Sequence, residues 1–460
     1  MTAANTQMEL GAARSDGPSV QEVLALDVVA PPPELREGYY EYLGSEDIPV
    51  ERYTSQAWHD LEVERLWRKV WQVACRSEDI PNVGDTTVYD IAEDSLVIVR
   101  SAPNQIRAFH NVCLHRGTTL VEEPGHVERL RCPFHGFTWD LDGRFVSMPC
   151  RWDFPHVDAE RFHLPEAKVD TWGGWVFVNM DSGCMPLSEF LGRFPEKFPW
   201  DHDHFTKQAH VSRLIACNWK VAMEAFLESF HVVVTHPQLL MAMGDANTQY
   251  DVLSGERRWN RMITAQAVPS PHLSGEPTQQ ELVDNLLGMQ FGPGASVALA
   301  EGQTARGLLA MLVRTQLQGA VAEGSVISDS EALDAIQYHV FPNFVPWGGY
   351  SRINYRFRPD GSDPNSCIME VMMLSPFDPA GPRPSPAAEL RLAPDQDWGD
   401  GTNFGLLADV FRQDMANLPR LQKGLRATRK AGVTLGDYQE VRIRHFHREL
   451  GRWLDPDGEG

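Results

Sequence analysis

Two cysteine–histidine pairs in this sequence have the residue types and the spacing of a metal site. Cys113 and His115 lie in NVCLHRG, Cys132 and His135 lie in CPFHG, and sixteen residues separate His115 from Cys132. Thiolates suit iron or zinc, and imidazole is a common neutral ligand for both metals. Four such ligands can hold a zinc ion. They can also hold a [2Fe–2S] cluster with two sulfurs on one iron and two imidazoles on the other, which raises the reduction potential above that of an all-cysteine cluster.

A second group of candidate ligands follows about a hundred residues later, in NWKVAMEAFLESFHVVVTHP. Two histidines and one carboxylate on one face of an iron ion leave three positions for O₂ and substrate. His231 and His236 are five positions apart, so on a regular helix they would point about 140° apart. The β-branched run before His236 and Pro237 after it disfavour helix, so we expect the helix to loosen there. Taken alone, this spacing also fits two ordinary polar histidines.

In this order, the two motifs resemble the large subunit of the Rieske non-haem iron ring-hydroxylating oxygenases. NVCLHRG and CPFHGFTWDLDG resemble the segments that bind the Rieske cluster, and NWKxxxExFLExxHxxxxH resembles the catalytic helix. Phe137 stands where this family commonly has tryptophan, and Trp139 stands where it commonly has tyrosine. Because both positions remain aromatic, we expect small effects on the cluster potential.

The resemblance implies the cofactors and the residues that bind them. A [2Fe–2S] cluster would be bound by Cys113, His115, Cys132 and His135. A mononuclear Fe(II) would be bound by His231, His236 and Asp414. Spacing alone cannot select Asp414 among 63 acidic residues, so this choice depends on the likeness of its surroundings to the late carboxylate helix of the family.

Glu228 is the residue that the resemblance places between the two metal sites. It precedes His231 by three positions, so the two side chains share a helix face. In the family, an acidic residue here hydrogen-bonds the iron-binding histidine and a cluster histidine across a subunit boundary, which here would be His135 of the partner subunit. Such a carboxylate orients the imidazole and raises its basicity. Ala225 replaces a frequent asparagine, which puts the polar contact usually made there in doubt.

Hydrophobic patterns predict the elements that must position these residues. Helical spacing occurs over 56–71, 219–236 and 403–429, and strand-like runs occur over 86–91, 95–99, 175–179, 350–357 and 368–374. We therefore predict an α+β fold in three parts. An N-terminal extension and helix over 1–71 would pack on the catalytic domain, a small all-β Rieske domain would span 72–182, and a larger catalytic domain with an antiparallel sheet flanked by helices would span 183–460.

Composition narrows the class of protein and its partners. With 41 basic and 63 acidic residues the chain has a formal charge of −22, so nucleic acid and anionic membrane surfaces are poor partners. No apolar stretch is long enough to span a bilayer, and the N-terminus does not have the pattern of a secretory signal. Seven cysteines, an odd number, favour a reducing compartment. We expect a cytoplasmic protein.

The resemblance implies an oxygenase component that uses O₂ to mono- or dioxygenate a small organic substrate. The residues expected near the substrate are mostly apolar and favour a hydrophobic, aromatic compound: Leu286, Leu287, Met289, Phe291, Met311, Phe344, Trp347 and Met372. The alternative activity is that of an O- or N-demethylating monooxygenase. Two other classes of protein also remain open, a Rieske electron carrier and a zinc-binding module. No GxGxxG segment follows a predicted strand, so an external ferredoxin or flavin reductase is expected. A head-to-tail homotrimer is implied, with or without a small β subunit.

Overall fold

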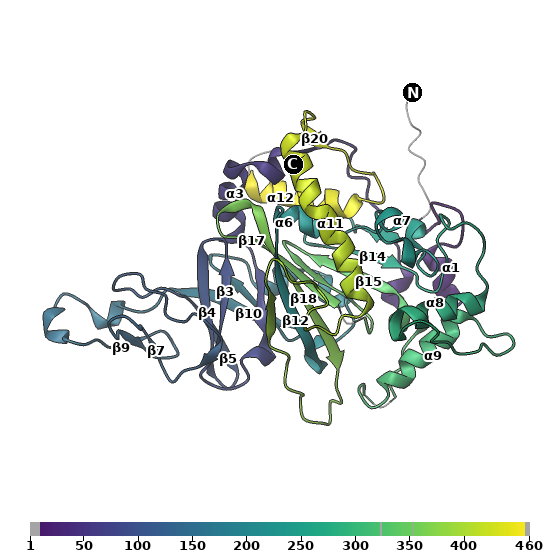
Figure 1. Cartoon of the computed structure of the whole chain (residues 1–460). Helices are drawn as coiled ribbons and strands as arrows, with labels where there is room; N and C mark the ends of the chain where they lie inside the picture. The colour runs from purple at the N-terminus through teal and green to yellow at the C-terminus, as the bar shows by residue number, and fades with distance from the viewer. Residues whose placement is uncertain (1–9, 323, 352, 456–460) are drawn as a thin grey trace. The chain divides into compact units, whose positions relative to one another are not determined.

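The computed structural model in Figure 1 describes residues 10–322, 324–351 and 353–455. Helices and sheets are both abundant, and the predicted α+β fold class is confirmed. None of the helices within these ranges is long and apolar enough to cross a membrane.

The chain separates into two compact units. The small unit consists of His59–Phe190 and Arg358–Asp363. The large unit consists of the described residues up to Trp58, of Leu191–Phe357, and of the described residues from Pro364 onward. The small unit is longer at both ends than the Rieske domain expected from the sequence, and it includes a short segment from late in the chain.

The small unit is built on a seven-stranded sheet of antiparallel pairs. In spatial order its strands are β2 (Gln72–Arg76), β11 (Trp175–Asn179), β10 (Glu166–Trp172), β5 (Gln105–His110), β4 (Asp94–Ala102), β3 (Asp85–Ile91) and β6 (Gly125–His126). A separate three-stranded sheet joins β7 (Leu130–Arg131), β8 (Thr138–Trp139) and β9 (Phe145–Ser147). Val97 and Val99 of the first sheet and Trp139 of the second belong to one buried core.

The large unit contains an eight-stranded sheet, except for residues 358–360 and 363 of that sheet, which belong to the small unit. Its order is β13 (Gln249–Asp251), β14 (Trp259–Thr264), β15 (Ala335–Val340), β16 (Phe344–Pro346), β17 (Ile353–Asp360), β18 (Asp363–Pro376), β12 (Phe205–Ile215) and β19 (Glu389–Leu392). The pairs from β13 to β17 and the pair β12–β18 are antiparallel, as expected. The edge strand β19, however, joins β12 in parallel.

The helices are mostly in the large unit. They are α1 (Val20–Ala25), α2 (Glu51–Thr54), α5 (Phe194–Lys197), α6 (Trp219–Glu224), α7 (Val232–Thr235), α8 (Gln279–Phe291), α9 (Ala305–Leu317), α10 (Asp329–Leu333), α11 (Leu406–Ala427) and α12 (Val441–Leu454). The small unit has a π-helical turn (Val63–Trp67), and both α3 (Gln56–Glu62) and α4 (Leu187–Leu191) contain residues of the two units. The long helix α11, labelled in Figure 1, contacts α6 and β12.

The helix expected over 219–236 is interrupted earlier than the sequence indicated. It ends at Glu224, and only one short turn, α7, forms later. The loop between them is held by Ser229, which is 1% exposed. The Ser229 backbone N–H donates to the Tyr250 hydroxyl at 3.0 Å, and its own hydroxyl lies 2.6 Å from that of Thr248. These tertiary hydrogen bonds replace the helical ones, which is why the break was not visible in the local pattern.

The N-terminal segment is fastened to the large unit by buried polar contacts. Asp251 accepts a hydrogen bond from the Tyr39 N–H at 2.8 Å, and Arg261 donates to the Glu34 carbonyl at 2.7 Å. Further along the unit, Arg306 donates to Asp27 at 2.8 Å. The partners in these bonds are 212, 227 and 279 positions apart in sequence. The segment is therefore an integral part of the unit.

The helices α8 and α9 pack into a small hydrophobic core of their own. It includes Leu287, one of the residues expected near the substrate. Two other such residues, Phe291 and Met311, are 61% and 45% exposed. The structure therefore does not gather these residues into one buried pocket.

Candidate metal sites

The two cysteine–histidine loops of the small unit share one backbone pattern. In each loop the cysteine carbonyl accepts a hydrogen bond from the glycine four residues later, at 2.9 Å from Gly117 and 3.0 Å from Gly136. In each loop the cysteine N–H also donates across the turn, at 2.8 Å. The two glycines have φ of +83° and +73°, a conformation that favours glycine. The pattern turns both cysteine sulfurs inward, and both residues are 2% exposed.

The four predicted cluster ligands come together at these loops. The rings of His115 and His135 are 4.7 Å apart in an edge-to-face arrangement, and the His115 ring stacks on Phe137 at 4.5 Å. The Nδ1 atoms of both histidines are buried and have no hydrogen-bond partner among the residues that the structure describes. A buried polar atom without a partner is costly unless something binds it. Two thiols and two unpartnered imidazole nitrogens are the donor set of a Rieske cluster.

The electrostatics of the sulfurs differ. Burial, the larger influence, raises the pKa of the Cys113 thiol. Burial also opposes ionisation of Cys132, but backbone N–H groups of the second loop bring its pKa below the ordinary value. Metal binding requires thiolates, so the N–H groups of the loop favour the form that a metal needs.

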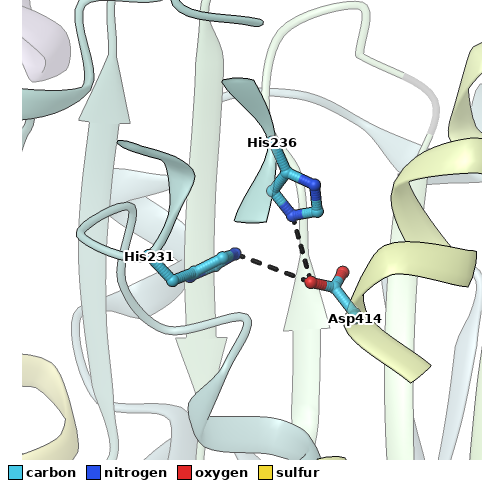
Figure 2. A group of neighbouring side chains, drawn as sticks. All are labelled: His231, His236 and Asp414. Carbon is cyan, nitrogen blue, oxygen red and sulfur yellow. Dashed lines mark ion pairs between the residues drawn. The ribbon is translucent and has the colours of Figure 1, made fainter. Parts of the chain in front are cut away.

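His231, His236 and Asp414 converge in the large unit, as Figure 2 shows. Asp414 Oδ1 lies 3.0 Å from His236 Nε2 and 3.7 Å from His231 Nε2. The two rings are 5.1 Å apart and inclined by 72°. The histidines can face one carboxylate because they lie at the two ends of α7 and not within a regular helix. Asp414 reaches them from α11.

The second nitrogen of each histidine is already occupied. Glu228 accepts at 2.6 Å from His231 Nδ1 and at 3.0 Å from the His231 backbone N–H. Gln413 accepts from His236 Nδ1 at 2.7 Å through its side-chain oxygen. Both Nε2 atoms are therefore directed at Asp414 with their lone pairs available to a metal. Burial opposes protonation of His231, but the carboxylates of Glu228 and Asp414 raise its pKa above the ordinary value.

The donor set and its surroundings fit a mononuclear iron. Two imidazoles and one carboxylate are the facial triad of non-haem Fe(II) oxygenases, and the partners at Nδ1 fix the ring orientations that such a site requires. His236 and Asp414 have side chains only 3% and 5% exposed. The His231 side chain is 26% exposed, so one edge of the site is open.

A pair of glutamines near His236 was not found from the sequence. Gln413 directly precedes Asp414 on α11, and Gln238 donates to its side-chain oxygen at 2.7 Å. One acceptor oxygen therefore serves two donors, which fixes the orientation of the Gln413 amide. Neutral glutamines have no characteristic spacing, and only the adjacency of Gln413 to Asp414 could have suggested a role.

We expect Gln413→Leu to weaken Fe(II) binding about tenfold or more, since loss of a hydrogen-bond partner to a metal-binding histidine typically has such an effect. Anaerobic titration of the mononuclear site with Co(II), followed by its visible spectrum in cluster-containing protein, measures the affinity. Gln413→Glu keeps an acceptor for His236 Nδ1 and is expected to restore binding. Equal affinities for wild type and the leucine variant would show that Gln413 does not position His236.

A further group of potential ligands is less suited to a metal. His210, Glu370 and Glu389 offer atoms within 4.8 Å of one another. Arg356, however, already donates to Glu370 at 2.6 Å, and Arg391 donates to Glu389 at 3.1 Å. Because both carboxylates are paired with guanidinium groups, this group is best described as an ion-pair cluster.

Glu224 of α6 belongs to a different buried network. Its carboxyl lies 2.7 Å from His447 Nε2 and accepts from the Tyr53 hydroxyl at 3.1 Å. Burial raises the pKa of Glu224 to about 8, although the Tyr53 hydrogen bond acts in the opposite direction. Burial, the largest influence, also holds the pKa of His447 well below its usual value. The side chains of Glu224 and His447 are therefore predominantly neutral at neutral pH, and the charged Arg52 lies 3.2 Å from His447 Nδ1.

We expect this network to make the folded protein less stable as the pH rises. The folded state keeps a proton on Glu224 that the unfolded chain loses, so stability falls from the ordinary pKa of 4.5 up to about 8. Glu224→Gln removes this titration, and its melting temperature relative to wild type should increase between pH 6 and pH 8. Calorimetry at several pH values measures it, with the exposed Glu196→Gln as control. A constant difference across this range would contradict the proton assignment.

Family models match most of the chain. The model described as the ring hydroxylating alpha subunit (catalytic domain) matches residues 199–456, and the Rieske [2Fe-2S] domain model matches residues 70–158. The glycine betaine monooxygenase oxygenase subunit of Pseudomonas aeruginosa is 30% identical over 200 residues, 43% of this chain and 46% of the relative. The biphenyl 2,3-dioxygenase subunit alpha of Rhodococcus jostii is 31% identical over 188 residues, 39% of this chain and 40% of the relative. These matches span less than half of each relative.

Solved structures share the fold over nearly the whole chain. A quaternary ammonium Rieske monooxygenase aligns with a TM-score of 0.64 at 17% identity and covers 93% of this chain and 100% of its own. Naphthalene 1,2-dioxygenase aligns with a TM-score of 0.61 at 15% identity and covers 90% of this chain and 93% of its own. At these identities the likeness concerns the fold.

Proposed function

Because the chain belongs to the ring hydroxylating alpha subunit family, we propose that it is the oxygenase component of a multi-protein electron-transfer system. The cofactors of its two domains are a [2Fe–2S] cluster and a mononuclear non-haem iron, so a zinc module is set aside. A simple Rieske electron carrier is set aside too, since it would not need the catalytic domain over 199–456. The activity proposed is the oxidation of a small organic molecule with O₂ and external electrons.

We assign the individual ligands by the geometry described above. The cluster would be held by Cys113, His115, Cys132 and His135, and the iron by His231, His236 and Asp414. The observation that best supports the iron ligands is the orientation of His231 and His236. The Nε2 atoms of both face Asp414, while their Nδ1 atoms are occupied by hydrogen bonds. When bound, the iron supplies the position where O₂ is activated. Asp414 contributes one negative charge, and Glu228 keeps the His231 Nδ1 proton in place.

The electrons, in this proposal, pass from the cluster of one chain to the iron of the next. Exposed apolar side chains flank both sites, which is typical of protein–protein contacts. Near the cluster loops, Phe134 and Trp152 are 57% and 79% exposed. Beside His231, Phe230 and Val234 are 52% and 81% exposed. A report on the quaternary ammonium Rieske monooxygenase describes inter-subunit electron transfer in that protein. We propose the same arrangement here, in a head-to-tail homotrimer with Glu228 as the bridge.

Mixed trimers test this arrangement sharply. His135→Ala removes a cluster ligand and Asp414→Ala an iron ligand, so each variant alone should be inactive. Trimers that contain both variant chains are isolated through two different tags. In each such trimer, one of the three contacts brings an intact cluster next to an intact iron site of the next chain. We therefore expect about one third of wild-type turnover. Transfer within a single chain would give no activity in any mixed trimer, and this result would overturn the proposal.

The substrate proposed is a hydrophobic, aromatic compound, and a quaternary ammonium compound undergoing N-demethylation is the second candidate. Aromatic side chains lie close to the iron site: the Tyr355 ring is 4.9 Å from Phe226 and 6.1 Å from Phe411, and Phe411 precedes Asp414 by one helical turn. Aromatic side chains near an iron site suit aromatic substrates and also cations that interact with ring faces. Substrate-dependent O₂ uptake with aromatic hydrocarbons, compared with glycine betaine and carnitine, decides between them.

A further inference from the structure

The C-terminal half of α11 and the turn after it form a basic region in an otherwise acidic chain. Residues 415–436 contain no aspartate or glutamate, although the whole sequence has 63 acidic residues and a charge of −22. The five basic residues of this stretch are all exposed: Arg420, Lys423, Arg426, Arg429 and Lys430. We call them the α11 basic stripe.

Most charges of the stripe have no acidic partner. Lys430 pairs with Asp47 at 2.8 Å. Within the part of the chain that the structure describes, the other four basic residues form no ion pair. Like charges placed together repel one another, and the arrangement is favourable only when an opposite charge approaches. The stripe therefore has the electrostatic character of a binding surface.

The surface of the stripe is hollowed on both sides. A hollow of about 490 Å³ is lined by Lys423 and Arg426 together with Gln422. A second hollow, of about 450 Å³, is lined by three basic residues, Arg426, Arg429 and Lys430, and by one acidic residue, Glu51. Arg426 contributes to both, so the two hollows adjoin, and basic side chains are the most numerous charged groups around them. Side chains of an acidic protein can enter such hollows and pair with the guanidinium groups.

We propose that the α11 basic stripe is the docking surface for the external electron donor, a small acidic electron-transfer protein. The inference rests on the proposed function, in which such a donor reduces the cluster. Lys423 follows Asp414 on α11 by nine positions. It therefore lies about 14 Å further along the helix axis, on the opposite face of the helix. A carrier of about 100 residues has a radius of gyration of about 13 Å. Bound at the stripe, it would sit on the helix that carries Asp414, next to the iron site that the partner subunit's cluster is proposed to approach.

A second copy of this chain fits the stripe less well as its occupant. Permanent contacts between subunits are rich in apolar side chains, and the proposed contact already has them in Phe134, Trp152, Phe230 and Val234. The stripe is mainly charged. A surface of this kind speeds encounter and releases its partner easily, which a shuttling electron carrier requires.

Stopped-flow reduction of the fully loaded protein tests the proposal. A plant-type [2Fe–2S] ferredoxin, kept reduced by its NADPH-dependent reductase, serves as the acidic probe, and bleaching of the cluster absorbance reports reduction. We expect the second-order rate constant to fall as salt rises. Lys423→Glu with Arg426→Glu should lower it at least tenfold at low salt and flatten the salt dependence, since electrostatic steering contributes factors of about 10 to 1,000.

Controls separate this proposal from the proposed function. Reduction by dithionite, a small molecule, should be equally fast in all variants; a cluster that dithionite cannot reduce would contradict the proposed function itself. Arg257→Glu with Lys168→Glu changes the same number of exposed charges elsewhere and should keep the wild-type rate. Lys423→Gln with Arg426→Gln, a milder change, should give a smaller effect in the same direction.

Three results would overturn the docking proposal. One is that the ferredoxin reduces the wild-type cluster at a rate that does not depend on salt, or does not reduce it at all. Another is a charge-reversal variant that is reduced as fast as wild type. The third is a change in assembly mass on sedimentation of the charge-reversal variant, which would assign the stripe to contacts between copies of this chain.

Discussion

Glu228→Gln is expected to slow product formation by about a hundredfold while both metal sites stay loaded and the cluster stays reducible. Glu228 accepts two hydrogen bonds from His231, at 2.6 and 3.0 Å, and its side chain is 10% exposed. Glutamine keeps the shape but removes the charge that holds the Nδ1 proton. The substitution therefore weakens both the orientation of His231 and the proposed link to the cluster of the partner subunit.

Single-turnover experiments locate the effect. Protein reduced beforehand with dithionite is mixed with O₂ and substrate, and cluster reoxidation is compared with product formation. Both should slow together in Glu228→Gln, whereas Glu228→Asp, which keeps a carboxylate, should recover part of the rate. Glu196→Gln, at a residue whose side chain is 72% exposed, serves as the matched control. Turnover close to wild type would remove Glu228 from the electron path.

Asp414→Ala should abolish activity, with a loss of about three orders of magnitude or more. Among the residues that the structure describes, Asp414 is the one carboxylate within reach of both His231 and His236, at 3.7 and 3.0 Å from their Nε2 atoms. Two neutral imidazoles alone bind Fe(II) poorly, because the Asp414 carboxylate supplies both a ligand and a negative charge directly on the metal. The cluster, held by the other unit, should be unaffected.

Elemental analysis distinguishes this result from general unfolding. Wild type should contain about three irons and two acid-labile sulfides per chain, and Asp414→Ala about two irons and two sulfides. Asp409→Ala changes an exposed carboxylate on the same helix and should keep all three irons. Retention of three irons by Asp414→Ala would mean that another residue completes the mononuclear site.

The sequence was most informative where chemistry depends on local spacing. Cys113 with His115 and Cys132 with His135 lie on two short loops, so their spacing alone indicated a four-ligand site. The family was recognised from these loops and the later histidine segment. The α+β fold class followed, because strand-like alternation and helical periodicity occur in separate stretches of the chain.

Features that depend on distant residues were not predictable in the same way. The helix break before His231 is held by Ser229 bonding to Thr248 and Tyr250, and nothing near Ser229 in sequence announces it. Gln413 lies 177 positions from His236, and a neutral glutamine has no distinctive pattern. Asp414 needed the family resemblance, because an isolated aspartate resembles any surface charge. The parallel edge strand β19 also depends on a distant pairing.

The fastening of the N-terminal segment has a consequence for protein synthesis. Asp27, Glu34 and Tyr39 emerge from the ribosome first, but their partners Arg306, Arg261 and Asp251 follow more than two hundred residues later. Between them the ribosome makes the whole stretch His59–Phe190 of the small unit. The last part of the small unit, Arg358–Asp363, is made after all three partners. Since domains generally fold as units, neither unit can be completed until residue 363 has been made.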